Sequence, residues 1–203
     1  MSDKPLARRA RVHGEHYTWR SLWVGASTLQ ERGRLDESGS WWATLSAMLL
    51  AYTALEAYLN YLGPSLCPGE WTNEKAFFSK GKYRGTLGKL ALLLDRCGLP
   101  WDPSRQPWQT LKEINKRRDL IAHPRNEHWD EEIAFLSPGD LRSRDSAFYA
   151  LVDEKFVDRA MAAIEAVCDP LHVAAARILE GGPAFGPSAF HGMVGHSGGS
   201  ILD

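Results

Sequence analysis

The sequence has few cysteines, no long apolar run and no excess of charge of either sign. Its three cysteines, Cys67, Cys97 and Cys168, are far apart and form no Cys-x-x-Cys pair, which argues against a disulfide framework and a thiolate zinc site. This cysteine usage is typical of a reducing compartment, so we expect a cytoplasmic protein. The 24 basic and 25 acidic residues leave a formal charge of −1. That balance excludes a globally basic nucleic-acid-binding protein but not local basic patches.

Membrane insertion and secretion are also not expected. Residues 41–55 are fifteen mostly apolar residues without a charge, and they are followed by the polar residues Glu56 and Asn60. A membrane-spanning helix needs about 20 apolar residues, so we interpret this stretch as a buried helix. The N-terminus has Arg8 and Arg9 but no apolar run behind them, and it does not resemble a signal peptide.

Apolar residues recur at helical spacing along most of the chain, which predicts an all-α fold. We expect an antiparallel bundle of four to five helices, and Gly63-Pro64 is expected to end the second of them. Residues 1–15 are predicted to be a flexible N-terminus, 16–180 the helical domain, and the Gly/Pro/Ser-rich residues 181–203 a disordered tail. The helical patterns cover residues 19–33, 41–62, 86–98, 107–123 and 153–180.

Two charged residues lie on the apolar faces of their predicted helices. With Leu111 at 0° on a helical wheel, Arg118 lies at about 340°, inside the apolar arc of its helix. With Leu45 at 0°, Glu56 lies at about 20°. Burying such a charge is costly unless it is paired or open to a cleft. Two interpretations follow: a structural Glu56–Arg118 ion pair, or an Arg118 that lines a polar cleft and is positioned by Glu56.

His123 bears on this choice because it follows Arg118 by five positions and immediately precedes Pro124. The helix is expected to end there, because a residue before proline disfavours the α conformation. The imidazole can therefore turn from the end of the helix toward the cleft that Arg118 lines. A simple helix cap is the alternative interpretation of His123.

The stretch KRRDLIAHP at residues 116–124, in which an arginine is followed after four residues by a histidine, resembles the signature of HEPN domains. These are small helical-bundle ribonucleases of toxin–antitoxin, phage-defence and RNA-processing systems. The stretch ALEAYLN at residues 54–60 resembles the acid-bearing helix that packs beside the motif helix in many members. The resemblance covers residues 17–179. It implies that Arg118 and His123 are catalytic, supported by Glu56, Asp119 and Asn60.

These two side chains suit RNA cleavage, because RNA carries its own nucleophile, the ribose 2′-hydroxyl. An imidazole can accept its proton and a guanidinium can stabilise the charge that develops on the phosphate oxygens. No cluster has metal-ligand spacing, and we expect neither a metal nor a cofactor. The resemblance implies metal-independent endonucleolysis that leaves a 2′,3′-cyclic phosphate. It also implies a homodimer. A site with one arginine and one histidine has no second proton donor for the leaving 5′-oxygen, and a second copy of the chain would supply one. An antitoxin or a regulatory protein could be a further partner.

Two basic stretches favour an anionic partner. Residues 105–125 carry six basic and two acidic residues, and residues 75–89 carry five basic residues and no acidic one. We expect four side chains of the first stretch to contact RNA: Lys112, Lys116, Arg117 and Arg125. A solvated charged surface without a ligand is the alternative. The acidic run at residues 127–132 could border the same cleft.

A second function remains open at this point. The chain could be a catalytically inactive HEPN-like module that binds a protein or a nucleotide. Arg118 would then be structural, and the repeated Ala-Phe pairs at 184–185 and 189–190 would form a docking peptide.

Overall fold

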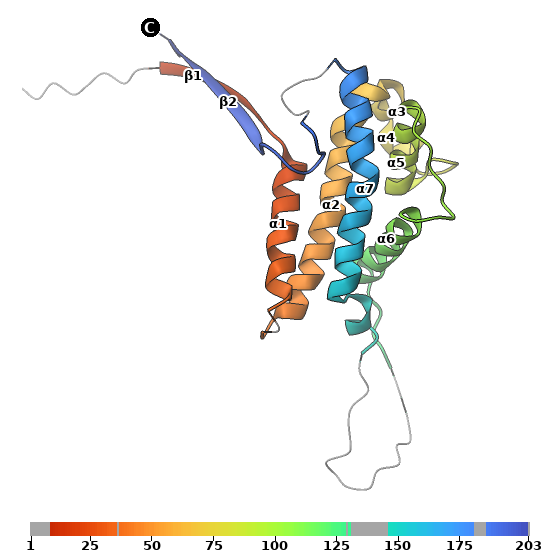
Figure 1. Cartoon of the computed structure of the whole chain (residues 1–203). Helices are drawn as coiled ribbons and strands as arrows, with labels where there is room; N and C mark the ends of the chain where they lie inside the picture. Colours follow the sequence, from red (N-terminus) through yellow and green to blue (C-terminus); the bar gives the residue numbers. More distant parts are fainter. Residues whose placement is uncertain (1–8, 36, 129, 131–145, 181–185, 203) are drawn as a thin grey trace, which may run out of the picture. The chain divides into compact units, whose positions relative to one another are not determined.

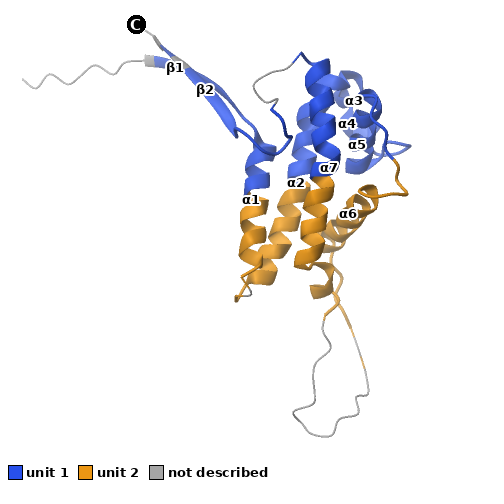
Figure 2. Ribbon diagram, viewed as in Figure 1, with its two compact units in different colours: residues 1–24, 53–101, 165–203 blue, residues 25–52, 102–164 orange. Residues whose placement is uncertain are grey.

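A computed structural model of the chain describes residues 9–35, 37–128, 130, 146–180 and 186–202. The chain divides into two compact units, which Figure 2 colours separately. Unit 1 comprises Met1–Val24, Thr53–Trp101 and Glu165–Asp203, and unit 2 comprises Gly25–Tyr52 and Asp102–Ile164. Three long helices each contribute to both units, so each unit is described below by itself.

Helices make up most of the described chain (Figure 1). The α-helices are α1 (Thr18–Gly33), α2 (Ser40–Leu66), α3 (Pro68–Thr72), α4 (Glu74–Phe77), α5 (Gly85–Arg96), α6 (Trp108–Ala122) and α7 (Glu154–Ile178). A 3-10 helix, η2, covers Tyr149–Leu151. Two strands, β1 (Arg9–His16) and β2 (Gly195–Leu202), complete the elements. The prediction of a mostly helical fold is confirmed, and the five predicted helices correspond to α1, α2, α5, α6 and α7.

The predicted end of the second helix at Gly63-Pro64 was wrong. Helix α2 continues to Leu66, because Pro64 lies in its last turn and removes only one hydrogen bond there. Gly63 does not end the helix. It allows close packing of Trp71, because a Cβ at this position would overlap the indole ring. The segment that follows was predicted to be a loop, and it contains the short helices α3 and α4.

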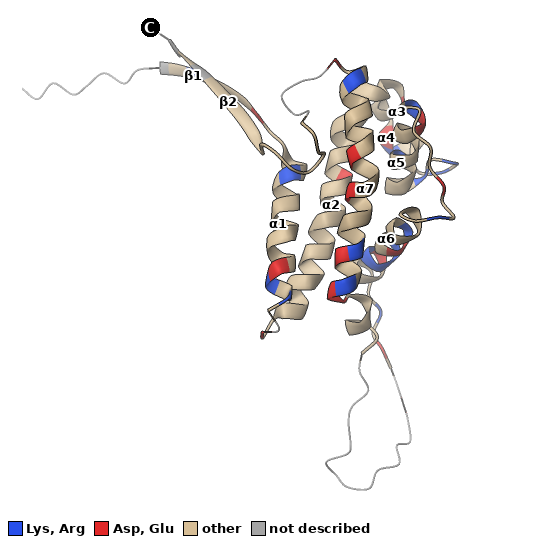
Figure 3. Cartoon of the chain, in the orientation of Figure 1, with Lys and Arg blue, Asp and Glu red and all other residues tan. Residues whose placement is uncertain are grey.

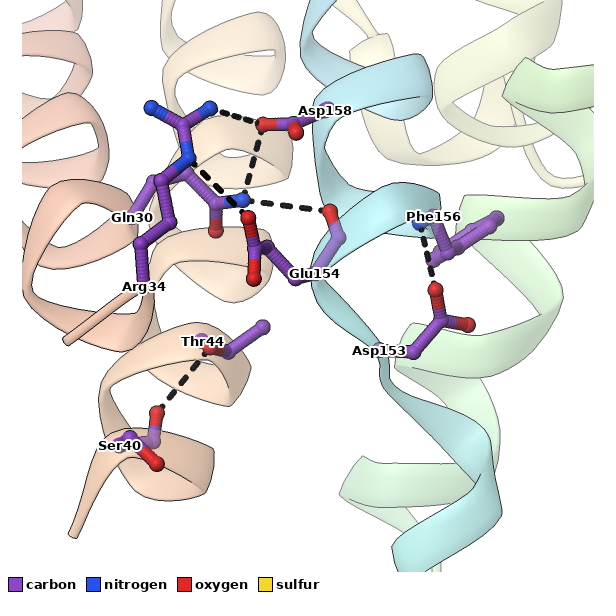
Figure 4. A network of polar contacts seen from close by, with 8 residues as sticks. All are labelled: Gln30, Arg34, Ser40, Thr44, Asp153, Glu154, Phe156 and Asp158. Atoms are coloured by element: carbon purple, nitrogen blue, oxygen red, sulfur yellow. Dashed lines mark hydrogen bonds and ion pairs between the residues drawn. The ribbon is translucent and has the colours of Figure 1, made fainter. Parts of the chain in front are cut away.

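Unit 2 is built from parts of α1, α2 and α7 together with α6. Its core includes fully buried apolar side chains from α2, α6 and α7: Ala47, Met48, Leu111, Ile114, Phe156 and Ile164. Polar contacts join α1 to α7 (Figure 4). Gln30 donates from Nε2 to Asp158 Oδ1 at 2.9 Å and to the Glu154 carbonyl at 3.2 Å, and Arg34 bonds the same Asp158 oxygen at 2.5 Å. At the start of α7, Asp153 accepts a hydrogen bond from the Phe156 N–H and so caps the helix.

Unit 1 contains the rest of α1, α2 and α7 together with α3, α4, α5 and both strands. Its buried apolar side chains come from α2, α5 and α7: Leu55, Leu59, Leu62, Leu90, Leu93 and Leu171. Two aromatic side chains of α1, Trp19 and Trp23, are also buried here.

The C-terminal segment 186–202 has defined structure, so the predicted disorder of the tail was wrong for these residues. Phe190 is 1% exposed and stacks on Trp23, with ring centroids 4.2 Å apart. The buried guanidinium of Arg20 donates to the carbonyl of Ala189 at 3.3 Å and to that of Met193 at 2.8 Å. These long-range contacts order a segment whose composition alone favours disorder. Residues 181–185 lie outside the described part of the chain.

The end of this segment pairs with the beginning of the chain. Strands β1 and β2 form an antiparallel two-stranded sheet in which Arg9 pairs with Leu202 and His16 with Gly195. The predicted flexibility of residues 1–15 was therefore wrong for residues 9–15, and residues 1–8 lie outside the described chain. The pairing continues one step beyond the strands, where the Tyr17 N–H donates to the Val194 carbonyl at 2.7 Å.

None of the helices in the described residues has the length and apolar character that crossing a membrane requires.

We expect the stacked Phe190 to stabilise the protein strongly. Phe190→Ala should lower the free energy of unfolding by about 3–5 kcal/mol, because it removes a fully buried ring and leaves a cavity. His191→Ala is the matched control, since His191 is exposed and lies at the surface, 2.8 Å from Glu165. Urea denaturation measures both changes. Equal stability of the two variants would show that Phe190 does not pack on Trp23 of α1.

Stability should also depend on the protonation of His172. This side chain is fully buried, and the Tyr58 hydroxyl lies 3.1 Å from its Nδ1. Burial first, and then the charge of Arg20, lower the pKa of His172 from 6.5 to about 4. The unfolded chain therefore binds a proton at a higher pH than the folded chain. The free energy of unfolding should fall as the pH falls from 6.5 to about 4.

His172→Gln should reduce this slope, which urea denaturation over that pH range measures. His13→Gln is the control, because His13 is exposed. A wild-type slope retained in His172→Gln would contradict the assignment.

Candidate active site

Helix α6 carries the Arg-x4-His motif, and the end of this helix determines where His123 lies. Its buried residues, Trp108, Thr110, Leu111 and Ile114, anchor the first two turns in unit 2. The helix ends at Ala122, one residue before the predicted end at His123, because Pro124 has no N–H and disfavours the α conformation at the preceding residue. His123 leaves the helical conformation, with φ −128° and ψ 58°, and donates its N–H to the Asp119 carbonyl at 3.0 Å.

A surface hollow of about 740 Å³ lies beside this helix end, within unit 2. It has both charged and apolar walls, which come from α6, from the residues that follow it and from the region of η2. The lining residues are Asn115, Lys116, Asp119, Leu120, His123, Pro124, Arg125, Glu127, Ala147, Phe148 and Leu151. Four predicted site residues are thus brought together: His123, Asp119, Lys116 and Arg125.

Arg118 is next to this hollow but is not among its lining residues. Its Nη1 donates to Asp119 Oδ1 at 2.8 Å, and its guanidinium lies 4.8 Å from the centre of the Tyr52 ring. The side chain keeps 30% of its surface exposed, so solvent can reach the cation. The Tyr52 hydroxyl in turn donates to Asn115 Oδ1, and Asn115 lines the hollow. Two neighbours therefore hold the guanidinium in a defined place: the carboxylate of Asp119 and the ring of Tyr52.

Asp119 connects the two predicted catalytic residues. Its carboxylate accepts from Arg118, and its backbone carbonyl accepts from the N–H of His123. The same residue lines the hollow. The sequence left open whether Asp119 orients His123, pairs across a dimer interface or is only an exposed residue. The bond from the His123 N–H is the regular i to i−4 bond of a helix, whereas the bond to Arg118 was not predicted.

Glu127 shapes the lining of the hollow in a way that the sequence did not reveal. Its carboxylate accepts hydrogen bonds at 3.0 Å from the Ser146 hydroxyl and from the N–H groups of Ala147 and Phe148. These bonds join the chain after α6 to the residues before η2. The acidic run at residues 127–132 was expected to border the cleft. Of its four carboxylates, Glu127 lies at the hollow, Asp130 is exposed, and Glu131 and Glu132 lie outside the described residues.

Arg117, which we expected to contact RNA, is held by the protein itself. Its guanidinium lies 3.6 Å from the centre of the Phe156 ring, donates to the Leu151 carbonyl at 2.7 Å and pairs with Glu113. Only 19% of its side chain is exposed. A phosphate would have to replace these contacts in order to reach it.

The other residues that we expected to contact RNA differ in how far their side chains are accessible to a ligand. Lys116 and Arg125 are exposed at the hollow, and Figure 3 shows the Lys and Arg positions of α6. Lys112 donates to the Pro103 carbonyl at 2.8 Å, in a loop that Asp102 organises. Side-chain and backbone hydrogen bonds from Ser104, and then the charge of Lys112, lower the pKa of Asp102 below its ordinary value. Lys112 therefore supports this loop.

Glu56 and Asn60, the other two predicted supporting residues, belong to unit 1. Glu56 Oε1 accepts from the Thr86 hydroxyl at 2.6 Å. Asn60 Oδ1 accepts from Lys89 Nζ at 2.8 Å and lines a second, smaller hollow together with Trp71 and Glu74. That Glu56 positions Arg118 stays a prediction. In the described part of the chain, no group of three or more His, Cys, Asp or Glu residues has the geometry of a metal site.

The placement of Arg117 predicts a structural role. Arg117→Ala should lower the free energy of unfolding by about 2 kcal/mol, because it removes a charged hydrogen bond and a cation–π contact. Lys116→Ala, at the exposed neighbouring position, should change stability by less than about 0.5 kcal/mol. Urea denaturation distinguishes them. An Arg117→Ala variant as stable as Lys116→Ala would refute this role.

In comparisons with known proteins, no family model matches the chain, and no curated protein or solved structure matches it significantly.

Proposed function

We propose that the chain is a metal-independent endoribonuclease of the HEPN type. One observation carries the proposal: at the end of α6, Asp119 holds the Arg118 guanidinium through its side chain and the His123 backbone through its carbonyl. A general base and a phosphate-binding cation thus lie at the same helix end, beside a hollow with two further exposed cations, Lys116 and Arg125.

In the proposed reaction, the ribose 2′-oxygen attacks the adjacent phosphorus and the bond to the 5′-oxygen of the next nucleotide breaks. His123 accepts the proton of the 2′-hydroxyl as the new P–O bond forms. Arg118 stabilises the negative charge on the non-bridging phosphate oxygens, where a guanidinium can donate two parallel hydrogen bonds. The products are a 2′,3′-cyclic phosphate and a 5′-hydroxyl. Because the nucleophile belongs to the substrate, the scheme requires no metal ion to generate it.

The leaving 5′-oxygen needs a proton, and one copy of the site has a single imidazole. We propose that a second copy of the chain supplies it, so that two His123 residues act as base and acid in a homodimer. An RNA-cleaving dimer of this kind suits a cytoplasmic toxin or phage-defence effector. Such an activity would be controlled by an antitoxin or a regulatory protein.

A second candidate function has a specific observation in its favour. Leu120, Pro124, Phe148 and Leu151 give the hollow apolar walls that would suit a protein segment or the base of a nucleotide. In a catalytically inactive binding module, the contacts of Arg118 with Asp119 and Tyr52 would be structural. The docking peptide of that alternative does not fit, because Ala189 and Phe190 are buried in unit 1, while residues 184–185 lie outside the described chain.

Cleavage of a labelled RNA by the purified protein in EDTA tests the proposal. Arg118→Ala and His123→Ala should each lower the cleavage rate by at least about 100-fold, the usual contribution of a general base or of a charge-stabilising group. Lys155→Ala, an exposed position on α7, should cleave like the wild type.

Circular dichroism would establish that both variants remain folded, and 2′-O-methyl RNA should resist cleavage because it has no free nucleophile. Undiminished cleavage by both variants would contradict the ribonuclease proposal. If the wild type binds RNA but does not cleave it, the catalytically inactive binding module is favoured.

A further inference from the structure

A basic segment of unit 1 covers most of α4 and the chain that leads from it to α5, and the site described above does not include it. From Lys75 to Leu94 the sequence has no acidic residue. Within this stretch, residues 75–84, which we call the basic loop, carry four exposed cationic side chains: Lys75, Lys80, Lys82 and Arg84. Lys75 lies in α4 (Glu74–Phe77), and the other three follow it before α5 begins at Gly85.

The backbone of the basic loop is fixed at both ends. Phe78 is buried, and its carbonyl accepts from the N–H of Gly85 at 2.9 Å. The backbone of Tyr83 packs so closely on Gly88 that a Cβ at Gly88 would overlap it. The loop therefore presents its cations from a defined backbone, which lowers the entropic cost of binding a ligand.

One carboxylate, Asp95, holds the middle of the loop. It accepts from Lys82 Nζ at 3.0 Å, from the Tyr83 hydroxyl at 2.7 Å and from the Trp101 indole at 2.7 Å. These three hydrogen bonds, together with the charge of Lys82, lower the pKa of Asp95 against the opposing effect of burial. Lys82 is thus partly neutralised by its own neighbour, as Lys89 is by Glu74.

The remaining cations of the loop are free to bind. Among the described residues, the side chains of Lys75, Lys80 and Arg84 form no hydrogen bond and no ion pair. Beside them, the Phe77 ring is 41% exposed. Helix α5 starts at the end of the loop, and its first turn has no acidic residue that would oppose an anion.

We propose that the basic loop is a second RNA-binding surface, which holds a single strand through its phosphates and through one stacked base. The identity of the polyanion as RNA rests on the proposed function. Lys75, Lys80 and Arg84 contact phosphates, and Phe77 stacks on a base. An exposed ring beside cations favours nucleic acid over a lipid surface, because the loop tip 79–82 (Ser-Lys-Gly-Lys) has no apolar side chain to insert.

The test measures binding of a fluorescent 2′-O-methyl RNA of about 12 nucleotides by anisotropy, in EDTA. This probe cannot be cleaved through a 2′-hydroxyl. The double variant K80E/R84E should bind at least about tenfold more weakly at low salt, and the slope of log K against log salt should decrease by about 1.4. Phe77→Ala should weaken binding about tenfold without changing that slope.

The matched control is K155E/R177E, which changes the net charge by the same amount at two exposed positions on α7. It should leave the slope unchanged. Equal weakening by the two double variants would overturn the proposal, since binding would then follow net charge alone. If the wild type bound phosphatidylglycerol vesicles or polyglutamate as tightly as it binds the RNA probe, the assignment to RNA would be overturned.

This experiment separates the two proposals. If the wild type cleaves RNA but K80E/R84E binds the probe normally, the basic loop is not an RNA-binding surface and the proposed function stands. If the wild type does not cleave RNA but K80E/R84E alone loses binding, the ribonuclease proposal fails and the RNA-binding surface stands. Thermal unfolding should show that both double variants fold like the wild type.

Discussion

The termination of α6 is the constraint on which the candidate site depends. Pro124 prevents the helix from continuing, so His123 takes a non-helical conformation, and its N–H makes the last i to i−4 bond of the helix, to the Asp119 carbonyl. The carboxylate of the same aspartate holds the guanidinium of Arg118, and the ring of Tyr52 supports that cation from α2. The Asp119 side chain therefore holds the cation, and the last turn of the helix places the backbone of His123 beside it. The hollow beside them is completed by Glu127, which ties the chain after α6 to the residues before η2.

Much of the helical architecture followed from local signals. Apolar spacing, Gly98 and Pro124 placed α5 and α6 to within about two residues, the usual precision of helix ends. The strands and the ordered C-terminal segment could not be predicted in this way. Their stability comes from pairing and packing between residues more than 160 positions apart, such as Arg20 with Ala189, and local composition carries no sign of such contacts.

For the site, sequence reasoning identified the helix end and its histidine but not the surroundings of each arginine. The wheel put Arg118 inside the apolar arc and Arg117 outside it, yet Arg117 is the less exposed of the two, at 19% against 30%. A wheel describes one helix alone, whereas Leu151 and Phe156 return from later in the chain to cover Arg117. The role of Glu127 was equally hidden, because its partners lie about 20 residues further along the chain.

The central claim is that Arg118 and His123 act on the same phosphodiester group of a bound RNA at the end of α6. Nuclear magnetic resonance of protein labelled at arginine and histidine side chains, titrated with uncleavable 2′-O-methyl RNA, tests it directly. The account predicts that the Arg118 Nε–H and the His123 ring signals shift together and give one dissociation constant, and that Asp119→Asn weakens the Arg118 response. RNA binding that moves only one of the two signals, or neither, would contradict it.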